Sequence, residues 1–191
     1  MYNKYMDKRQ EKSIQTIYES FTSLINKKKY DDITIQDILN EGHISRSTFY
    51  AHFKTKDELL LKISGNIFDH VFSHSLKEEK THDFSSDDIL DYKHLITHIF
   101  YHLKDEKELI SGILSSSASI LFLDGFKKHL NKFMDAYLNN YPYDKQIPIK
   151  LLKIMMVNNF ISIIQYWKEN KFKDTPEELT EYFIDTFKKV I

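Results

Sequence analysis

The chain has 191 residues, 41% of them hydrophobic and 14% aromatic, which is enough to bury one ordinary domain with a smaller one attached and excludes a disordered polypeptide. Four glycines and three prolines are too few for a hairpin-rich β protein, and the absence of cysteine excludes disulfide frameworks and thiolate sites. The net charge of −1 conceals a basic N-terminal part, since residues 1–56 hold ten Lys or Arg against seven Asp or Glu.

Long helices joined by few breaks are therefore expected, and the first is an amphipathic helix over residues 9–26. Its apolar side chains follow the i, i+3, i+4, i+7 spacing: they are Ile14, Ile17, Tyr18, Phe21, Leu24 and Ile25. A second helix of about two turns follows, because Thr34 is a good N-cap and Asp37 completes a variant of the capping box. Gly42 and His43 then mark a turn.

A third, short helix is predicted directly after that turn. Ser45 is its N-cap, and Phe49 and Phe53 lie four residues apart on the face expected to pack inward. Thr55 with Glu58 forms a further capping box, which opens a long fourth helix. Two helices joined by a short turn that contains glycine form a helix-turn-helix, whose second helix lies in the DNA major groove.

Five more helices are predicted in the C-terminal part, at about 86–104, 105–116, 118–140, 147–170 and 176–190. The last one opens with Thr175, Pro176 and Glu178, which combine an N-cap, a proline at the first helical position and a capping-box glutamate. The polar stretch 74–88 is expected to connect the fourth helix to this bundle.

The segment TIQDILNEGHISRSTFYAHFKTKDELL, residues 34–60, resembles the helix-turn-helix of the TetR/AcrR family of transcriptional regulators. The resemblance rests on the capped second helix, the small-residue turn, the serine that caps the third helix, the Thr-aromatic-Tyr run, the following Phe53 and the Lys-Asp-Glu-Leu-Leu that starts the fourth helix. One departure is His43, which stands where the family commonly has its turn glycine, one place after Gly42.

This resemblance implies two domains. A three-helix DNA-binding head is expected over residues 8–68, with the helix-turn-helix at about 31–50. The long fourth helix joins this head to a C-terminal helical bundle over residues 69–191, which serves ligand binding and dimerisation. The expected fold is all-α with about nine helices.

The first turn of the third helix holds the side chains that are expected to reach base edges. Arg46 is one of only two arginines, and it suits bidentate contact with guanine. The resemblance assigns Tyr50 and Lys56 to phosphate, and Lys54 flanks a helix start that favours the same anion. Plain capping is the alternative role of this polar turn, but capping requires Ser45 alone. The expected DNA contacts are Thr34, Ser45, Arg46, Ser47, Thr48, Tyr50, His52, Lys54 and Lys56.

Residues 151–168, LLKIMMVNNFISIIQYWK, are hydrophobic on nearly every side of the predicted helix. They include more apolar side chains than one core-facing stripe can bury. Together with residues 178–191 they are expected to form a four-helix interface with a second copy. One helix-turn-helix offers too small a base-reading surface for high specificity, so the resemblance implies a homodimer that reads two half-sites on a double-stranded DNA operator.

The resemblance also implies an effector pocket in the C-terminal bundle, whose occupancy shifts the fourth helix and changes the spacing of the two reading heads. No charged residue stands alone in an apolar run to indicate the chemistry of the ligand. The expected effector is a small apolar or aromatic molecule. Aromatic residues at helical spacing fill bundle cores anyway, so plain core packing is the competing role of each candidate. The candidates are Phe68, Phe72, His98, Tyr101, His102, Phe122, Phe126, Met155, Asn159 and Trp167.

Two histidine series have the i, i+4 spacing that allows a shared metal ion. One comprises His94, His98 and His102, and the other His70 and His74. Neither is accompanied by cysteine or by an HExxH motif, so ordinary neutral histidines are expected, and no metal or cofactor is predicted.

The expected function is that of a cytoplasmic, homodimeric transcriptional regulator, a repressor that a ligand releases from a palindromic operator. An alternative within the family is a regulator, including an activator, that responds to a protein partner or to no effector. The remote alternative is a helical interaction bundle or an enzyme, but no catalytic triad order, phosphate loop or carboxylate pair supports catalysis. No signal segment or membrane span is predicted.

Overall fold

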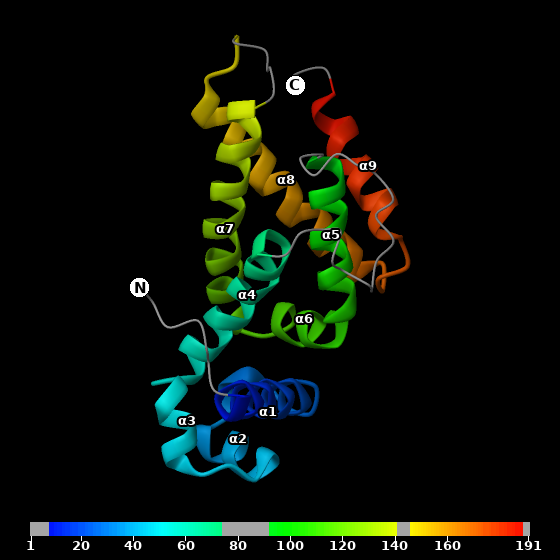
Figure 1. The fold of residues 1–191 in the computed structure, drawn as a ribbon. Helices are drawn as coiled ribbons and strands as arrows, with labels where there is room; N and C mark the ends of the chain where they lie inside the picture. The colour runs from blue at the N-terminus through cyan, green and yellow to red at the C-terminus, as the bar shows by residue number, and fades with distance from the viewer. Residues whose placement is uncertain (1–7, 74–91, 141–145, 189–191) are drawn as a thin grey trace, which may run out of the picture. The chain divides into compact units, whose positions relative to one another are not determined.

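The computed structural model describes residues 8–73, 92–140 and 146–188. Within these ranges every regular element is helical, with nine α-helices and one short 3-10 helix (Figure 1). The predicted all-α fold is confirmed, and each of the nine predicted helices is present. The polar stretch 74–88, expected to be a connection, lies outside the described residues, as do His74 and the side chains of Phe68, His70 and Phe72.

The helices form two compact units. The first comprises the chain up to Ile63 together with Glu108–Phe122, and the second comprises Ser64–Lys107 and Leu123–Ile191. The first unit thus includes a segment of the C-terminal part in addition to the predicted head.

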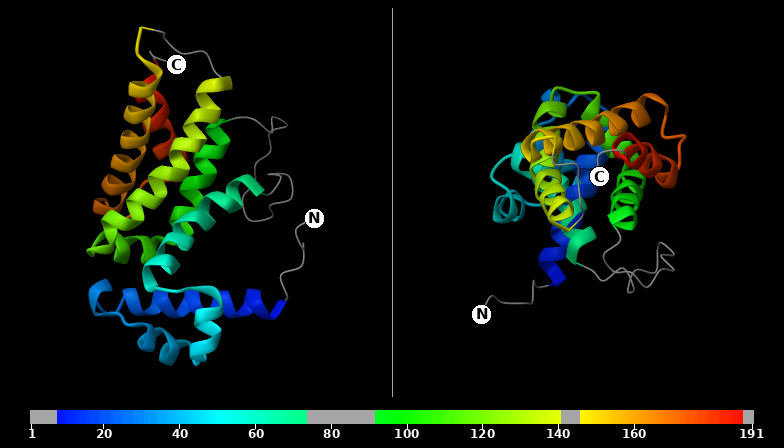
Figure 2. Two further views of the ribbon diagram at one scale, coloured as in Figure 1. Left: turned by 90° about the vertical axis from the view of Figure 1, so that its left-hand side faces the viewer. Right: turned by 90° about the horizontal axis from the view of Figure 1, so that it is seen from above.

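Two short helices of the first unit pack against one long helix. α2 and α3 lie on the same side of α1 and pack against it, with Ile17 and Phe21 of α1 fully buried (Figure 1, Figure 2). The bounds are α1 (Lys8–Ile25), the 3-10 helix η1 (Tyr30–Asp32), α2 (Ile35–Gly42), α3 (Arg46–His52), the start of α4 (Lys56–Ser73), and most of α6 (Lys107–Leu114).

Two contacts hold the segment of residues 108–122 on the head. A Cβ added to Gly112 of α6 would lie 3.1 Å from Cγ2 of Ile25, so glycine allows α6 to approach the end of α1 closely. The Ser117 hydroxyl donates to Asp31 at 2.6 Å. These contacts join parts of the chain that are far apart in sequence, so no local sequence pattern predicts them.

The second unit has an aromatic core. Phe100 of α5 stacks on Phe160 of α8 with a centroid distance of 4.7 Å, and Trp167 meets Phe100 edge-on at 6.0 Å. α9 packs against both α5 and α8, and the hydroxyls of Thr97 and Thr180 are 2.9 Å apart between α5 and α9. The bounds are α5 (Tyr92–Asp105), α7 (Ala118–Asn140), α8 (Ile149–Glu169) and α9 (Pro176–Phe187).

A tight connection joins α8 to α9. Lys171 and Phe172 both adopt the left-handed conformation, with φ of 56° and 54°. The indole Nε1 of Trp167 donates to the Asp174 carbonyl at 2.9 Å, and the amide of Asn170 donates to the Asp174 carboxylate at 2.6 Å. These bonds tie Asp174 to the end of α8, and the Phe172 N–H closes the turn by donating to the Trp167 carbonyl at 2.8 Å.

No single helix among the described residues has both the length and the hydropathy to cross a membrane. Only the bent pair of α6 and α7 meets that test when the two are counted together, as core helices of globular proteins also do.

Candidate nucleic-acid interface

The start of α2 is fixed by the predicted capping box. The Thr34 hydroxyl accepts from the Asp37 N–H at 3.1 Å, and the Thr34 N–H donates to the Asp37 carboxylate at 2.7 Å. A hydrogen bond from Lys28, 2.7 Å away, is the largest of the effects that hold the pKa of Asp37 well below its usual range, and bonds from Thr34 add to it. The carboxylate therefore stays ionised and keeps the first turn of α2 closed.

The turn after α2 explains why histidine stands where glycine was expected. His43 adopts the left-handed conformation with φ 49° and ψ 39°, and the N–H of Ile44 closes the helix end by donating to the Leu39 carbonyl at 3.0 Å. Gly42 is needed one place earlier, because a Cβ there would lie 2.4 Å from the Ser20 hydroxyl of α1. The chain thus uses its glycine for the approach of α2 to α1 and leaves the left-handed residue to histidine.

The first turn of α3 presents a cluster of hydroxyls, of which Ser45 and Ser47 are exposed and Thr48 is half-buried. Ser45 accepts from the Thr48 N–H at 3.0 Å, which confirms the predicted N-cap. The Ser45 oxygen also lies 2.8 Å from the hydroxyls of both Ser47 and Thr48. Beneath this surface Phe49 is fully buried, so one face of α3 is anchored while the hydroxyls face outward.

The other expected DNA contacts, with one exception, are also accessible. Arg46 is exposed and donates from Nη2 to Oε1 of Gln36 on α2 at 2.8 Å. Tyr50 is 50% exposed, Lys54 is exposed and His52 is partly exposed. Gln36 was not among the predicted residues, although its exposed place on α2 opposite the third helix was a usable signal.

The exception is Lys56, whose ammonium group points into the head. Its Nζ donates to the carbonyls of Tyr30 at 2.7 Å, Ile33 at 2.9 Å and Asp31 at 3.4 Å, and it lies 4.3 Å from the centroid of the Tyr30 ring. An ammonium group has three donors, and all three are directed at these carbonyls. We therefore infer that Lys56 makes a structural contact between α4 and residues 30–33, and its phosphate contact stays a prediction.

A second bond reinforces that contact. The Tyr30 hydroxyl donates to the Asp57 carboxylate. Burial is the largest of the effects that raise the pKa of Tyr30 above its usual range, followed by the hydrogen bond to Asp57. The phenol therefore remains a neutral donor, and Tyr30 is attached to the first turn of α4 through both its carbonyl and its hydroxyl.

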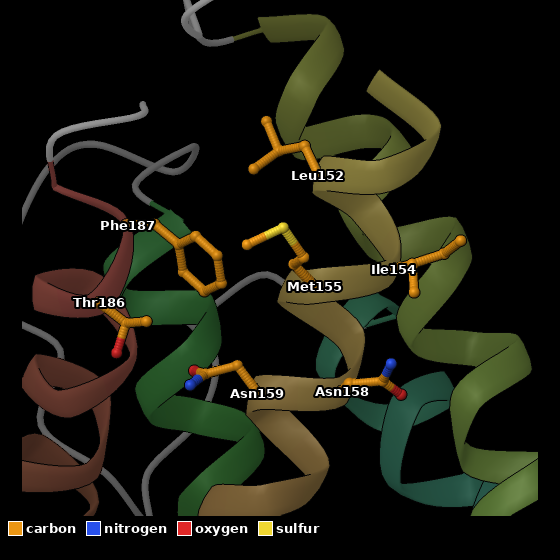
Figure 3. Close-up of a pocket in the computed structure, with 7 residues that line it drawn as sticks. All are labelled: Leu152, Ile154, Met155, Asn158, Asn159, Thr186 and Phe187. Carbon is orange, nitrogen blue, oxygen red and sulfur yellow. The ribbon is translucent and has the colours of Figure 1, made fainter. Parts of the chain in front are cut away.

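The predicted effector residues whose side chains the structure describes lie in several places, and an effector pocket among them stays a prediction. His98, Phe126 and Trp167 are buried in the core of the second unit, Tyr101 and His102 are half-buried, and Phe122 belongs to the first unit. Met155 and Asn159 line a partly open pocket of about 370 Å³ between α8 and α9 (Figure 3). The pocket is completed by Leu152, Ile154, Asn158, Thr186 and Phe187.

The histidine series contains one close pair. The Nε2 atoms of His98 and His102 are 2.9 Å apart, a hydrogen bond in which one ring donates and the other accepts. Among the residues that the structure describes, no cluster of three or more His, Asp or Glu side chains could hold a metal ion.

Two family models match the chain. The model of bacterial regulatory proteins of the tetR family matches residues 17–63, which contain α2, the turn and α3. A transcriptional regulator C-terminal region of the TetR type matches residues 91–189, which is more than half of the chain. The chain belongs to the TetR family. As a TetR-family protein it is a helix-turn-helix transcriptional regulator that binds DNA, and it is not an enzyme.

Curated relatives include two regulators. The TetR-family chain is 24% identical over 189 residues to IcaR of Staphylococcus epidermidis, named as a negative regulator of the biofilm operon icaADBC, and the match covers 88% of this chain and 97% of IcaR. It is 28% identical over 95 residues to the HTH-type regulator YuxN of Bacillus subtilis, covering 50% of this chain. The match spans 32% of the length of YuxN.

Solved structures show the same fold. A TetR transcriptional regulator from Streptococcus agalactiae is 26% identical with a TM-score of 0.68, and the match covers 94% of this chain and 96% of that one. DhaS, an activator of a dihydroxyacetone kinase operon, is 19% identical with a TM-score of 0.59, covering 93% and 94%. These likenesses show the same fold over both units of the TetR-family chain.

Proposed function

We propose that this TetR-family regulator is a homodimeric repressor that binds a palindromic operator through α3 and is released by a small apolar or aromatic effector. The observation that carries the proposal is the exposed first turn of α3, where Arg46 and three hydroxyls stand on a helix anchored by Phe49. Capping alone requires one of those hydroxyls, so the rest are available to DNA.

The exposed side chains divide by their chemistry. Arg46 is assigned to a guanine edge, with Ser45, Ser47 and Thr48 beside it in the groove. Tyr50 and Lys54 are assigned to phosphate, as partners that position the head without reading sequence. Thr34 at the start of α2 and His52 at the end of α3 complete this contact set.

Dimerisation is supported by the outer face of α8. Three large apolar side chains share this face in the first two turns of α8 and are exposed in the single chain: Leu151, Ile154 and Met155. Tyr166 and Tyr182 continue the exposed surface on α8 and α9, at 46% and 43%. Apolar side chains grouped on one helix face are typical of a surface that another protein covers, and a second copy would bury them in a four-helix interface.

Repression and release by an effector have separate support. Repression is supported by the similarity to IcaR, a negative regulator, over nearly its whole length. The alternative is a regulator that responds to a protein partner or to no effector, and it is favoured by the tight packing of His98, Phe126 and Trp167. A thermal-shift screen of small apolar and aromatic molecules separates the two, because a pocket ligand raises the melting temperature by mass action.

Selection of bound DNA from a random library tests the proposed function. Enrichment of a palindrome with half-sites about one helical turn or more apart is the expected result. A gel shift on the DNA upstream of the protein's own gene then locates the operator. No enrichment, together with no binding at low salt, would refute the proposal.

A further inference from the structure

Three polar side chains form a chain across the exposed faces of α2 and α3. Nη2 of Arg46 donates to Oε1 of Gln36 at 2.8 Å, and Nε2 of Gln36 donates to Oδ1 of Asn40 at 2.9 Å. All three residues are exposed, so in the free protein these bonds compete with water and add little to stability. Their main effect is to position the Arg46 guanidinium.

The Gln36 contact restricts Arg46 before DNA is bound. A free arginine samples many rotamers, and fixing one of them on a base edge costs conformational entropy. Oε1 of Gln36 removes part of that freedom in advance. Asn40 accepts from the nitrogen of the Gln36 amide, so the amide oxygen of Gln36 faces Arg46. Only that oxygen can accept a hydrogen bond from a guanidinium.

A guanidinium held in this way can still read a base. Bidentate recognition uses either the two terminal nitrogens or Nε with one terminal nitrogen. Nη2 carries two hydrogens, and whichever one is given to Gln36, the other completes one of these two edges. Arg46 can therefore bond Gln36 and both O6 and N7 of guanine at the same time.

We propose that Gln36 is a specificity-determining positioning residue that acts on DNA through Arg46 and is itself oriented by Asn40. The proposal rests on the proposed function, in which Arg46 reads guanine. Gln36 is therefore expected to change base preference only at the position that Arg46 reads. Docking in the groove excludes water from the Gln36–Arg46 bond, which makes that bond stronger in the complex than in the free protein.

A double-mutant cycle on the selected operator tests the coupling. Gln36→Met keeps the length of the side chain and removes the acceptor, and it lowers the preference for guanine at one position by about three- to tenfold, the loss expected for one hydrogen bond. In an Arg46→Ala background the same substitution has no further effect. Gln36→Glu retains the acceptor and keeps the preference.

The matched control is Gln15→Met. Gln15 is an exposed glutamine on α1 that also bonds a side chain four residues on, Glu19 at 3.0 Å, and its substitution leaves base preference at the wild-type value. Equal losses of guanine preference from Gln36→Met with and without Arg46 would show that Gln36 contacts DNA directly, which would overturn the proposal. An unchanged guanine preference in the single variant Gln36→Met would also overturn it. Failure of the wild-type protein to bind any operator would instead refute the proposed function.

Discussion

At the scale of single residues, the turn between α2 and α3 shows two backbone demands met by neighbouring positions. Gly42 has no Cβ to collide with Ser20, and His43 carries the left-handed conformation. A non-glycine residue in that conformation is strained by contact between its Cβ and the backbone. The sequence predicted the turn and its length, but the close approach of Ser20 comes from α1 and has no local signature.

Replacing His43 by glycine relieves that strain. His43→Gly is expected to raise the free energy of unfolding by about 0.5–1 kcal/mol, since the relief exceeds the added entropy of the unfolded chain. The measurement is the urea midpoint at fixed protein concentration. Gly42→Ala, one residue earlier, is expected to lower the same midpoint, and a lower midpoint for His43→Gly would contradict the assignment of strain to His43.

At the scale of the elements, helix starts were predictable and contacts between helices were not. The capping boxes at Thr34 and Thr175 were read from residues three apart, and both are present. Lys56 and its carbonyl partners are more than twenty residues apart, so no periodic sequence pattern could predict that contact. The effector residues stay a prediction, because aromatic spacing on a helix does not distinguish core from pocket lining.

A substitution at Lys56 tests whether this lysine has a structural role. Lys56→Met is expected to lower the free energy of unfolding by about 1–2 kcal/mol, because it leaves the carbonyls of residues 30–33 without their charged donor. Urea unfolding measures this loss. Phosphate contact alone would predict unchanged stability, which would contradict the structural role.

Lys54→Met is the matched comparison in DNA binding. Lys54 is exposed two residues before Lys56, and its loss is expected to weaken binding to all sequences alike. The slope of log affinity against log salt is expected to fall by about 1, the value for one phosphate contact. An unchanged slope would remove Lys54 from the phosphate contacts.

At the scale of the whole molecule, the apolar face of α8 is the proposed dimer interface. Met155→Asp is expected to dissociate the dimer, because it places a charge in an interface without a counter-ion. Light scattering after size-exclusion chromatography measures the mass, and operator affinity is expected to fall at least about tenfold because one head reads only half of the site.

The control for that substitution is Ile120→Asp. Ile120 is a large apolar residue on α7 that is 73% exposed, against 44% for Met155. Its substitution is expected to leave mass and operator affinity unchanged. Equal dissociation by both variants, or by neither, would contradict an interface on α8 and α9.

The most direct test of α3 as the reading helix is the base preference of Arg46→Ala on the selected operator and on operators altered at single positions. The expected result is loss of discrimination at one guanine in each half-site, about 1–3 kcal/mol, with the preferences at other positions kept. An equal loss of affinity on every sequence, with the guanine preference intact, would contradict the assignment of Arg46 to a base and of α3 to sequence reading.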